Sequence, residues 1–212
     1  MEILAHRGFW HHEKEKNSNA AFARAFQHGF GVETDIRDLD GELVISHDMP
    51  RREGRFTLSE FLSLYTSYRN RTTLALNIKS DGIQDQLRNI LLEFDVDNYF
   101  VFDMSIPDTL GYAKLHMNFL SRHSDIEKEP LLYEESQGIW MDELQHEWID
   151  ASAIARYRTL GKKICLVSPE LHGRGHIEKW KIYQEVNQIF PNGMSLCTDY
   201  PESANEFFNK NN

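Results

Sequence analysis

Short apolar segments of strand length recur along the whole chain, and several of them are apolar at nearly every position. Continuous apolar runs of this length are typical of strands in a parallel sheet that is covered on both faces. We predict strands at residues 2–5, 31–36, 72–78, 99–102, 117–121, 138–141, 162–167 and 194–198, with a short extra strand at 43–46.

Amphipathic segments lie between most of these runs and are predicted to be helices. In the first of them, Asn17 or Ser18 is expected to cap the helix N-terminus. In the second, Thr57 and Glu60 have the spacing of a capping box. The predicted helices cover residues 17–28, 57–68, 83–94, 149–160, 177–190 and 201–209.

Eight strands that alternate with helices over about 200 residues fit a small (β/α)8 TIM barrel. A doubly wound open sheet is the alternative, because it has the same alternation of strands and helices. No linker rich in Pro, Gly or Ser and no internal repeat divides the sequence. We therefore expect residues 1–212 to form a single domain.

The charge and the cysteines restrict the choice of partner and compartment. The net charge of −10 opposes non-specific binding to nucleic acid or to an anionic membrane, although a local cationic pocket for a phosphate ester remains compatible with it. No apolar run approaches the roughly 18 residues of a membrane span, so stable membrane insertion is not expected. Without a signal-peptide pattern, and with Cys165 and Cys197 inside apolar runs, a cytoplasmic location is expected.

The second predicted strand carries two acidic residues, Glu33 and Asp35. Side chains two positions apart on a strand point to the same face. Two neighbouring carboxylates repel each other, and the pKa of one rises unless a cation lies between them. Mg²⁺ or Ca²⁺ suits oxygen ligands of this kind. A solvated acidic pair at a strand end explains this motif, taken alone, equally well.

Two histidines follow predicted strands. His6 precedes Gly8, which permits a tight turn, and His47 precedes Asp48, which can accept an imidazole N–H. Histidines on either side of a phosphodiester can act as general base and general acid. A hydrogen-bonded histidine without a catalytic role is the alternative for each of them.

Arg7 and Lys79 add positive charge at the same strand ends. The planar guanidinium group and the compact ammonium group both suit a phosphodiester anion. Simple charge balance for Glu33 and Asp35 is the alternative explanation.

These residues belong to a set of short motifs that resembles the glycerophosphodiester phosphodiesterase family, within the wider group of phosphodiesterases on TIM-type barrels. The motifs occupy the first third and the last tenth of the chain. In order, they are His6-Arg7-Gly8, Asn17-Ser18, Gly31-Val32-Glu33-Thr34-Asp35, Asp40-Gly41-Glu42-Leu43-Val44-Ile45-Ser46-His47-Asp48 and Thr198-Asp199-Tyr200-Pro201.

The resemblance implies metal-dependent cleavage of a glycerol-type phosphodiester. In such a reaction a neighbouring hydroxyl of the substrate attacks phosphorus, which gives a cyclic phosphate. Residue by residue, the resemblance assigns general acid and base to His6 and His47, the divalent metal, Mg²⁺ or Ca²⁺, to Glu33 and Asp35, and the phosphate contacts to Arg7 and Lys79.

The third strand departs from the family pattern, which has a Glu two residues before the Lys. Asn77 stands at that position and is expected to be the third metal ligand through its amide oxygen. The amide adds no charge, so weaker metal binding is expected than with three carboxylates. Other candidates are Glu170 and Asp142 as replacements for the missing carboxylate, and His172 and Arg174 as contacts to a substrate phosphate.

The leading hypothesis is a hydrolase of a small phosphodiester, and two alternatives stay open. One is a hydrolase of a larger lipid or glycan phosphodiester, for which Phe9 and Trp10 would supply an apolar mouth. The other is a pseudoenzyme that binds a phosphate ester without turnover, and Asn77 is the feature that motivates it. The oligomeric state is not indicated by the sequence.

Overall fold

The computed structural model describes residues 1–209, which divide into two compact units. The N-terminal unit is Ala5–Phe119, and the C-terminal unit combines Met1–Leu4 with the chain from Leu120 onward. β1 (Glu2–His6) therefore contributes its last two residues to the N-terminal unit. The single domain expected from the sequence stays a prediction.

The N-terminal unit contains a parallel sheet in the order β5-β4-β2, and β3 pairs with β2 in the antiparallel direction. The register sets Asp35 beside Asn77, and Asn77 beside Phe102. Its strands are β2 (Gly31–Leu39), β3 (Glu42–Ile45), β4 (Leu74–Ile78) and β5 (Tyr99–Phe102), and its helices are α1 (Asn19–Gln27), α2 (Leu58–Thr66), α3 (Gln84–Glu93) and α4 (Ile106–Lys114), after a short 3-10 turn, η1 (Glu13–Glu15).

The β2–β3 hairpin makes β2 longer than the apolar run predicted. Asp40 and Gly41 connect the two strands, and both have positive φ, 51° and 86°. An Asp-Gly pair in this conformation matches the twist of a two-residue hairpin, so pairing continues up to the turn. The hairpin holds the end of β3 beside the second half of β2.

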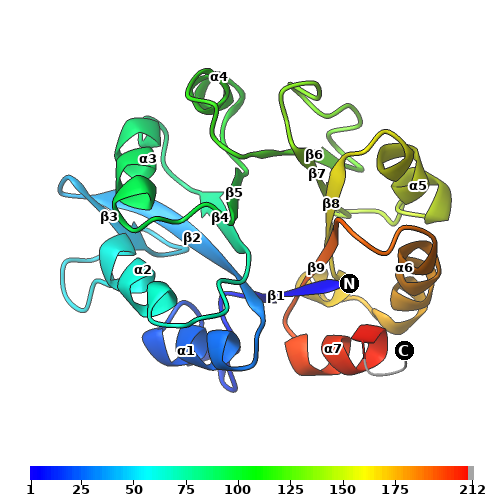
Figure 1. Ribbon diagram of the computed structural model, residues 1–212, viewed down its shortest axis with the longest axis horizontal. Coiled ribbons are helices and arrows are strands. Elements are labelled where there is room, and N and C mark those ends of the chain that lie inside the picture. The colour runs from blue at the N-terminus through cyan, green and yellow to red at the C-terminus, as the bar shows by residue number, and fades with distance from the viewer. Residues whose placement is uncertain (210–212) are drawn as a thin grey trace. The chain divides into compact units, whose positions relative to one another are not determined.

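Helices α1 and α2 pack next to each other against β2 and β3 (Figure 1). Their starts follow the predicted caps. The Ser18 hydroxyl accepts from the Ala21 amide at 3.2 Å, and Thr57 forms the capping box with Glu60. Ser18 and not Asn17 is therefore the cap of α1. Between the helices, the rings of Phe22 and Phe61 meet edge to face at 4.7 Å, which closes this part of the core.

The C-terminal unit contains a parallel sheet in the order β9-β8-β7-β6. Cys165 and Cys197 are buried on β8 and β9, and α5 and α6 stand together beside β8 (Figure 1). Its strands are β6 (Leu120–Ser124), β7 (Gly138–Asp142), β8 (Lys163–Val167) and β9 (Met194–Thr198). Its helices are α5 (Ala151–Thr159), α6 (Ile177–Ile189) and α7 (Pro201–Asn209), and a short 3-10 turn, η2 (Pro169–His172), follows β8.

Two predicted element positions are wrong. β6 lies three residues later than the predicted strand 117–121, and α4 was not predicted as a helix at all. α4 leaves Ile106 and Leu110 exposed, so it lacks the apolar stripe that marks a helix in the sequence. Within residues 1–209, no helix combines the length and the apolar character needed to cross a membrane.

Candidate functional site

The acidic pair on β2 lies at the centre of a charged cluster in the N-terminal unit. Glu33 and Asp35 are 2% and 1% exposed. His6 Nε2 lies 3.8 Å from Glu33 Oε2, and the amide of Arg7 donates to the same oxygen at 3.3 Å. Arg7 Nε and Lys79 Nζ lie 3.3 Å and 3.5 Å from the two carboxylate oxygens of Asp35. Five of the predicted site residues therefore meet in one cluster, the acidic pair and three cationic or imidazole side chains around it.

The turn after β1 brings Arg7 and Asn17 to this cluster. Both residues have positive φ, 55° and 58°, and the Asn17 amide donates to the carbonyl of Arg7 at 2.9 Å. The Asn17 side chain donates to Asp35 Oδ2 at 2.9 Å and accepts from the Thr34 hydroxyl at 2.8 Å. Asn17 is thus a site residue that the sequence indicated as a possible helix cap and as part of a motif, but without a role at the site.

His47 is held through hydrogen bonds to its backbone carbonyl, and no contact between its ring and the acidic pair is observed among the described residues. Arg37 Nε donates to the carbonyl of His47 at 3.1 Å, and Arg37 Nη1 donates to the carbonyl of Lys79 at 3.1 Å. The imidazole Nδ1 of His47 lies 2.8 Å from Asp48 Oδ1. Among residues 1–209, the His47 ring makes no other hydrogen bond. Asp48 therefore fixes Nδ1 as the protonated nitrogen and leaves Nε2 as the acceptor.

Burial and a like charge govern the protonation of Glu33. Loss of solvation is the largest cause that raises the pKa of its carboxyl, and the charge of Asp35 is the second, while His6, Arg7 and Lys79 act in the opposite direction. Together they raise this pKa from 4.5 to about 7. A carboxyl with a pKa near neutrality in a cluster of opposite charges is typical of functional sites.

Asn77 lies on β4 directly beside Asp35 and is 7% exposed. Its Nδ2 donates to Asp103 Oδ2 at 3.3 Å. Its Oδ1 has no hydrogen-bond partner within the described part of the chain. Buried polar atoms in proteins are nearly always satisfied, so this oxygen marks a position for a further ligand.

The oxygens of Glu33, Asp35 and Asn77 are the donor set available to a cation. Among residues 1–209, no group of three or more His, Cys, Asp or Glu side chains is arranged to hold a metal ion. Two carboxylates and one unsatisfied amide oxygen still fit a hard cation such as Mg²⁺ or Ca²⁺, which binds through oxygen and accepts neutral carbonyl ligands.

A cavity of about 160 Å³ adjoins this cluster. Asn17 is the residue of the cluster that lines it, and the rest of the lining comes from the end of β3 and the loop after it, including Ser46, Arg51, Glu53 and Arg55. The space suits a substituent of a few heavy atoms, with polar and cationic side chains around it.

The other candidate residues belong to the C-terminal unit. His172 Nε2 lies 2.7 Å from Asp142 Oδ1. The Glu170 carboxylate accepts from the hydroxyls of Ser168 and Thr198 and from the amide of Asp199. These bonds connect η2 to β9 and give Glu170 a structural role within its own unit.

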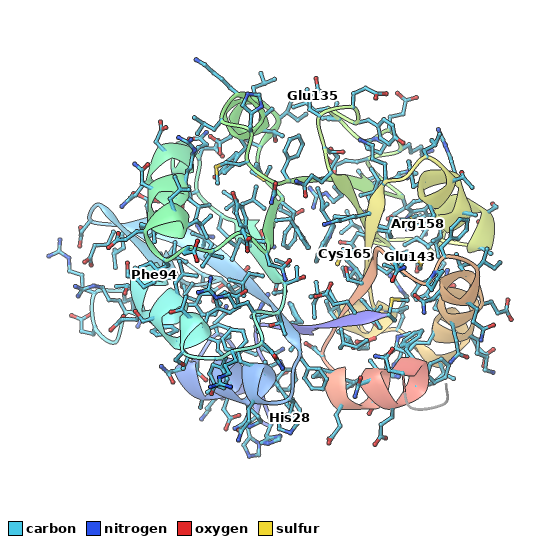
Figure 2. The ribbon with its side chains drawn as sticks, in the orientation of Figure 1. His28, Phe94, Glu135, Glu143, Arg158 and Cys165 are labelled. Atoms are coloured by element: carbon cyan, nitrogen blue, oxygen red, sulfur yellow. The ribbon has the colours of Figure 1, made fainter. Side chains whose placement is uncertain are left out.

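Glu143 directly follows β7 in the C-terminal unit and is only 2% exposed. The sequence did not indicate it as a candidate site residue. Figure 2 shows it next to α6, where Lys179 Nζ lies 2.8 Å from its Oε1. The amides of Trp148 and Ile149 donate to the same oxygen at 2.8 Å, and Arg174 donates to the Glu143 carbonyl. Arg174 and Lys179 thus hold the loop after β7 against α6.

Comparison with solved structures identifies the fold. A protein from Galdieria sulphuraria described as a candidate glycerophosphodiester phosphodiesterase superposes with a TM-score of 0.76 at 17% identity, over 98% of this chain and 97% of that one. A phosphodiesterase from Oleispira antarctica, solved with its product sn-glycerol-3-phosphate, gives 0.68 at 15% identity over 98% and 96%. The glycerophosphodiester phosphodiesterase of Agrobacterium tumefaciens gives 0.67 at 16% identity over 95% and 97%.

These likenesses extend over nearly the whole chain and confirm the predicted small TIM-barrel fold of eight parallel strands with helices. The doubly wound sheet is thereby excluded. The sequence itself matches no family profile, and none of the curated proteins compared with it is a detectable relative.

Proposed function

We propose that this protein is a metal-dependent phosphodiester hydrolase that cleaves a glycerophosphodiester or a related small phosphodiester. One observation carries the proposal: His6, Arg7 and Lys79 all lie within 3.8 Å of a buried acidic pair. The structural likeness to glycerophosphodiester phosphodiesterases supports the same reaction class. The Oleispira antarctica phosphodiesterase was solved with its product sn-glycerol-3-phosphate, which supports a diester of glycerol phosphate as the substrate class.

In this proposal, Glu33, Asp35 and Asn77 hold Mg²⁺ or Ca²⁺. When bound, such an ion stabilises negative charge on the phosphoryl oxygens. Arg7 and Lys79 bind the same anionic group, the first through a fork of N–H donors and the second as a point charge.

The two histidines divide the proton transfers. One imidazole removes a proton from the attacking hydroxyl, and the other returns a proton to the leaving oxygen, so that no free alkoxide forms. His47 suits such a role because Asp48 holds its Nδ1 and leaves Nε2 for substrate. His6 suits the other role by its position, because its Nε2 lies 3.8 Å from Glu33 Oε2 within the same cluster.

A small substrate is favoured over a lipid. Phe9 packs edge to face against Phe30 at 5.8 Å, and Trp10 Nε1 donates to the carbonyl of His6 at 3.1 Å. Both aromatic residues are therefore used to fix the turn after β1, and they do not form an apolar mouth. The cavity of about 160 Å³ beside Asn17 also suits a short leaving group.

The non-catalytic alternative is favoured by the amide at position 77, which lowers the charge available to a metal. Calorimetric titration with Mg²⁺ and Ca²⁺, followed by hydrolysis of a chromogenic phosphodiester with and without chelator, separates the two functions. Tight phosphate binding without turnover under any metal would favour the binding protein. The cytoplasmic location stays a prediction.

Substitution of the histidines tests the mechanism. His6→Ala and His47→Ala are each expected to lower turnover by roughly 10²–10⁴-fold, the usual contribution of a general acid or base. His146→Ala is the matched control, because this exposed histidine hydrogen-bonds through its backbone amide. Rates near normal in His6→Ala and His47→Ala would remove these residues from the mechanism.

A further inference from the structure

The side chain of Asn77 is held in one orientation by a neighbour on the next strand. Asp103 follows β5, and its Oδ2 accepts from Asn77 Nδ2 at 3.3 Å. An ionised carboxylate has no N–H or O–H to donate, so only the NH₂ group of the amide can face it. The carbonyl oxygen of Asn77 must then point to the opposite side of the amide group.

That opposite side belongs to the acidic pair. Asn77 pairs with Asp35 across the parallel strands β2 and β4, and paired residues on neighbouring strands project from the same face of a sheet. Asn77 Oδ1 is buried and has no hydrogen-bond partner among the described residues. Beside Asp35 there is thus a buried oxygen that accepts no hydrogen bond among the described residues, although buried acceptors in proteins nearly always have a partner.

The backbone explains why an Asp can stand at position 103. Its φ is +65°, in the left-handed region. Asp and Asn adopt this region more readily than other residues with a side chain, whereas β-branched residues rarely do. An Asp therefore meets the demand of the turn after β5 and also supplies the carboxylate that faces Asn77.

We propose that Asp103 is a positioning residue that orients the Asn77 amide, so that its carbonyl oxygen serves as the third, uncharged ligand of the divalent cation. This inference rests on the proposed function, because it concerns the cation of the same site. The acid that is missing from β4 is present one strand further on, where it acts on the cation through the ligand between them.

The central experiment measures Mg²⁺ and Ca²⁺ affinity by calorimetry in Asp103→Asn. This substitution keeps the size and the left-handed tolerance of the side chain, but its amide can donate as well as accept and no longer dictates how Asn77 turns. Loss of a hydrogen-bond partner behind a metal ligand lowers metal affinity by roughly 10–100-fold, and a loss of this size is expected. Asp95→Asn is the matched control: Asp95 also has a positive φ, 53°, but is exposed in the turn before β5.

The same measurement in an Asn77→Ala background separates orientation from charge. If Asp103 acts through the Asn77 amide, Asp103→Asn does not lower metal affinity any further once Asn77→Ala has removed that amide. The coupling free energy between the two substitutions then equals the whole effect of Asp103→Asn alone. An equal loss in both backgrounds would mean that Asp103 attracts the cation directly and would overturn the inference.

An exchanged pair gives an independent check that does not depend on a loss of function. In Asn77→Asp with Asp103→Asn, the amide at position 103 can donate to a carboxylate at position 77, which regains a defined orientation. Metal affinity equal to or above that of the unchanged protein is expected. Affinity as low as in Asp103→Asn alone would contradict the proposal.

Failure of the inference and failure of the proposed function give different results. Metal binding that responds to Asp103→Asn without any hydrolysis would remove the enzyme and leave the inference in place. Hydrolysis that needs no divalent ion, together with no calorimetric binding of Mg²⁺ or Ca²⁺, would remove the inference and leave a metal-independent hydrolase.

Discussion

The stability of the metal-free protein is expected to fall as the pH rises through neutrality, because of Glu33. Its carboxyl is 2% exposed, and burial followed by the charge of Asp35 raises its pKa from 4.5 to about 7. The folded state therefore binds this proton more tightly than the unfolded chain does. The resulting stabilisation is complete below about pH 4.5 and is lost as the pH rises through about 7.

The size of the effect follows from the difference between the two pKa values. A rise from 4.5 to about 7 corresponds to about 3 kcal/mol of unfolding free energy. This is a large fraction of the roughly 5–15 kcal/mol that stabilises a typical protein. Glu33→Gln removes the titration, because an amide resembles the protonated carboxyl at every pH.

Urea denaturation in the presence of a chelator, at about pH 5 and about pH 8, measures the difference. The unchanged protein is expected to lose up to about 3 kcal/mol more than Glu33→Gln between these two conditions. Groups that do not interact with Glu33 titrate equally in both proteins, so the difference reports Glu33 together with the charged groups around it. Stability profiles that run parallel would refute the reasoning, since the Glu33 carboxyl would then titrate alike in the folded and unfolded states.

Three further substitutions test other parts of the structure. Gly8→Ala is expected to lower the unfolding free energy by about 2–4 kcal/mol in urea denaturation, because φ is +86° and the new Cβ would lie 2.9 Å from α1; a change below about 1 kcal/mol would contradict the close approach. Asp48→Asn is expected to lower turnover by less than about 5-fold, because Asp48 is 92% exposed and exposed ion pairs contribute little; a loss as large as that of His47→Ala would show a stronger coupling. Lys179→Met is expected to lower the unfolding free energy by about 3–5 kcal/mol in the same assay, because it leaves the buried Glu143 carboxylate without its counter-charge. An unchanged unfolding free energy would show that the backbone amides of Trp148 and Ile149 alone satisfy this carboxylate.

The parts of the site that could be predicted from sequence are those set by local rules. Glu33 and Asp35 share a face because side chains alternate along a strand. Their meeting with His6 and Lys79 follows from parallel strands that end at one edge of a sheet. Ser18 was predictable as a cap because its hydroxyl is followed by an apolar pattern of helical spacing.

Asn17 and Asp103 could not be assigned in this way, because their roles depend on partners far along the chain. Asn17 contacts Asp35, 18 residues away, and Asp103 contacts Asn77, 26 residues away. Both residues have positive φ, and Asn and Asp are the side-chain-bearing residues most often found there. That preference was the available signal, but it does not specify what the side chain touches.

β6 illustrates the same limit for the fold. The predicted strand stopped at residue 121, but β6 runs through Arg122 and His123 to Ser124. His123 is buried because its Nδ1 pairs with the Tyr157 hydroxyl at 2.8 Å and its ring lies 4.0 Å from that of Trp148. Polar residues are placed inside by such tertiary partners, which a local pattern of apolar positions does not contain.

The replacement of an acid by Asn77 changes the balance between the metal and the substrate. When both acids are ionised, their charge equals that of Arg7 and Lys79, the two cations that contact Asp35. A third carboxylate in contact with the metal would leave more negative charge facing an anionic phosphodiester, whereas the amide leaves the site more positive once a divalent ion is bound. Under the proposed function, the amide is expected to weaken the hold on the metal and to strengthen the attraction for the substrate. On this argument Asn77 is compatible with catalysis provided that its oxygen is held in place, and Asp103 supplies that constraint from a strand that does not contribute a metal ligand.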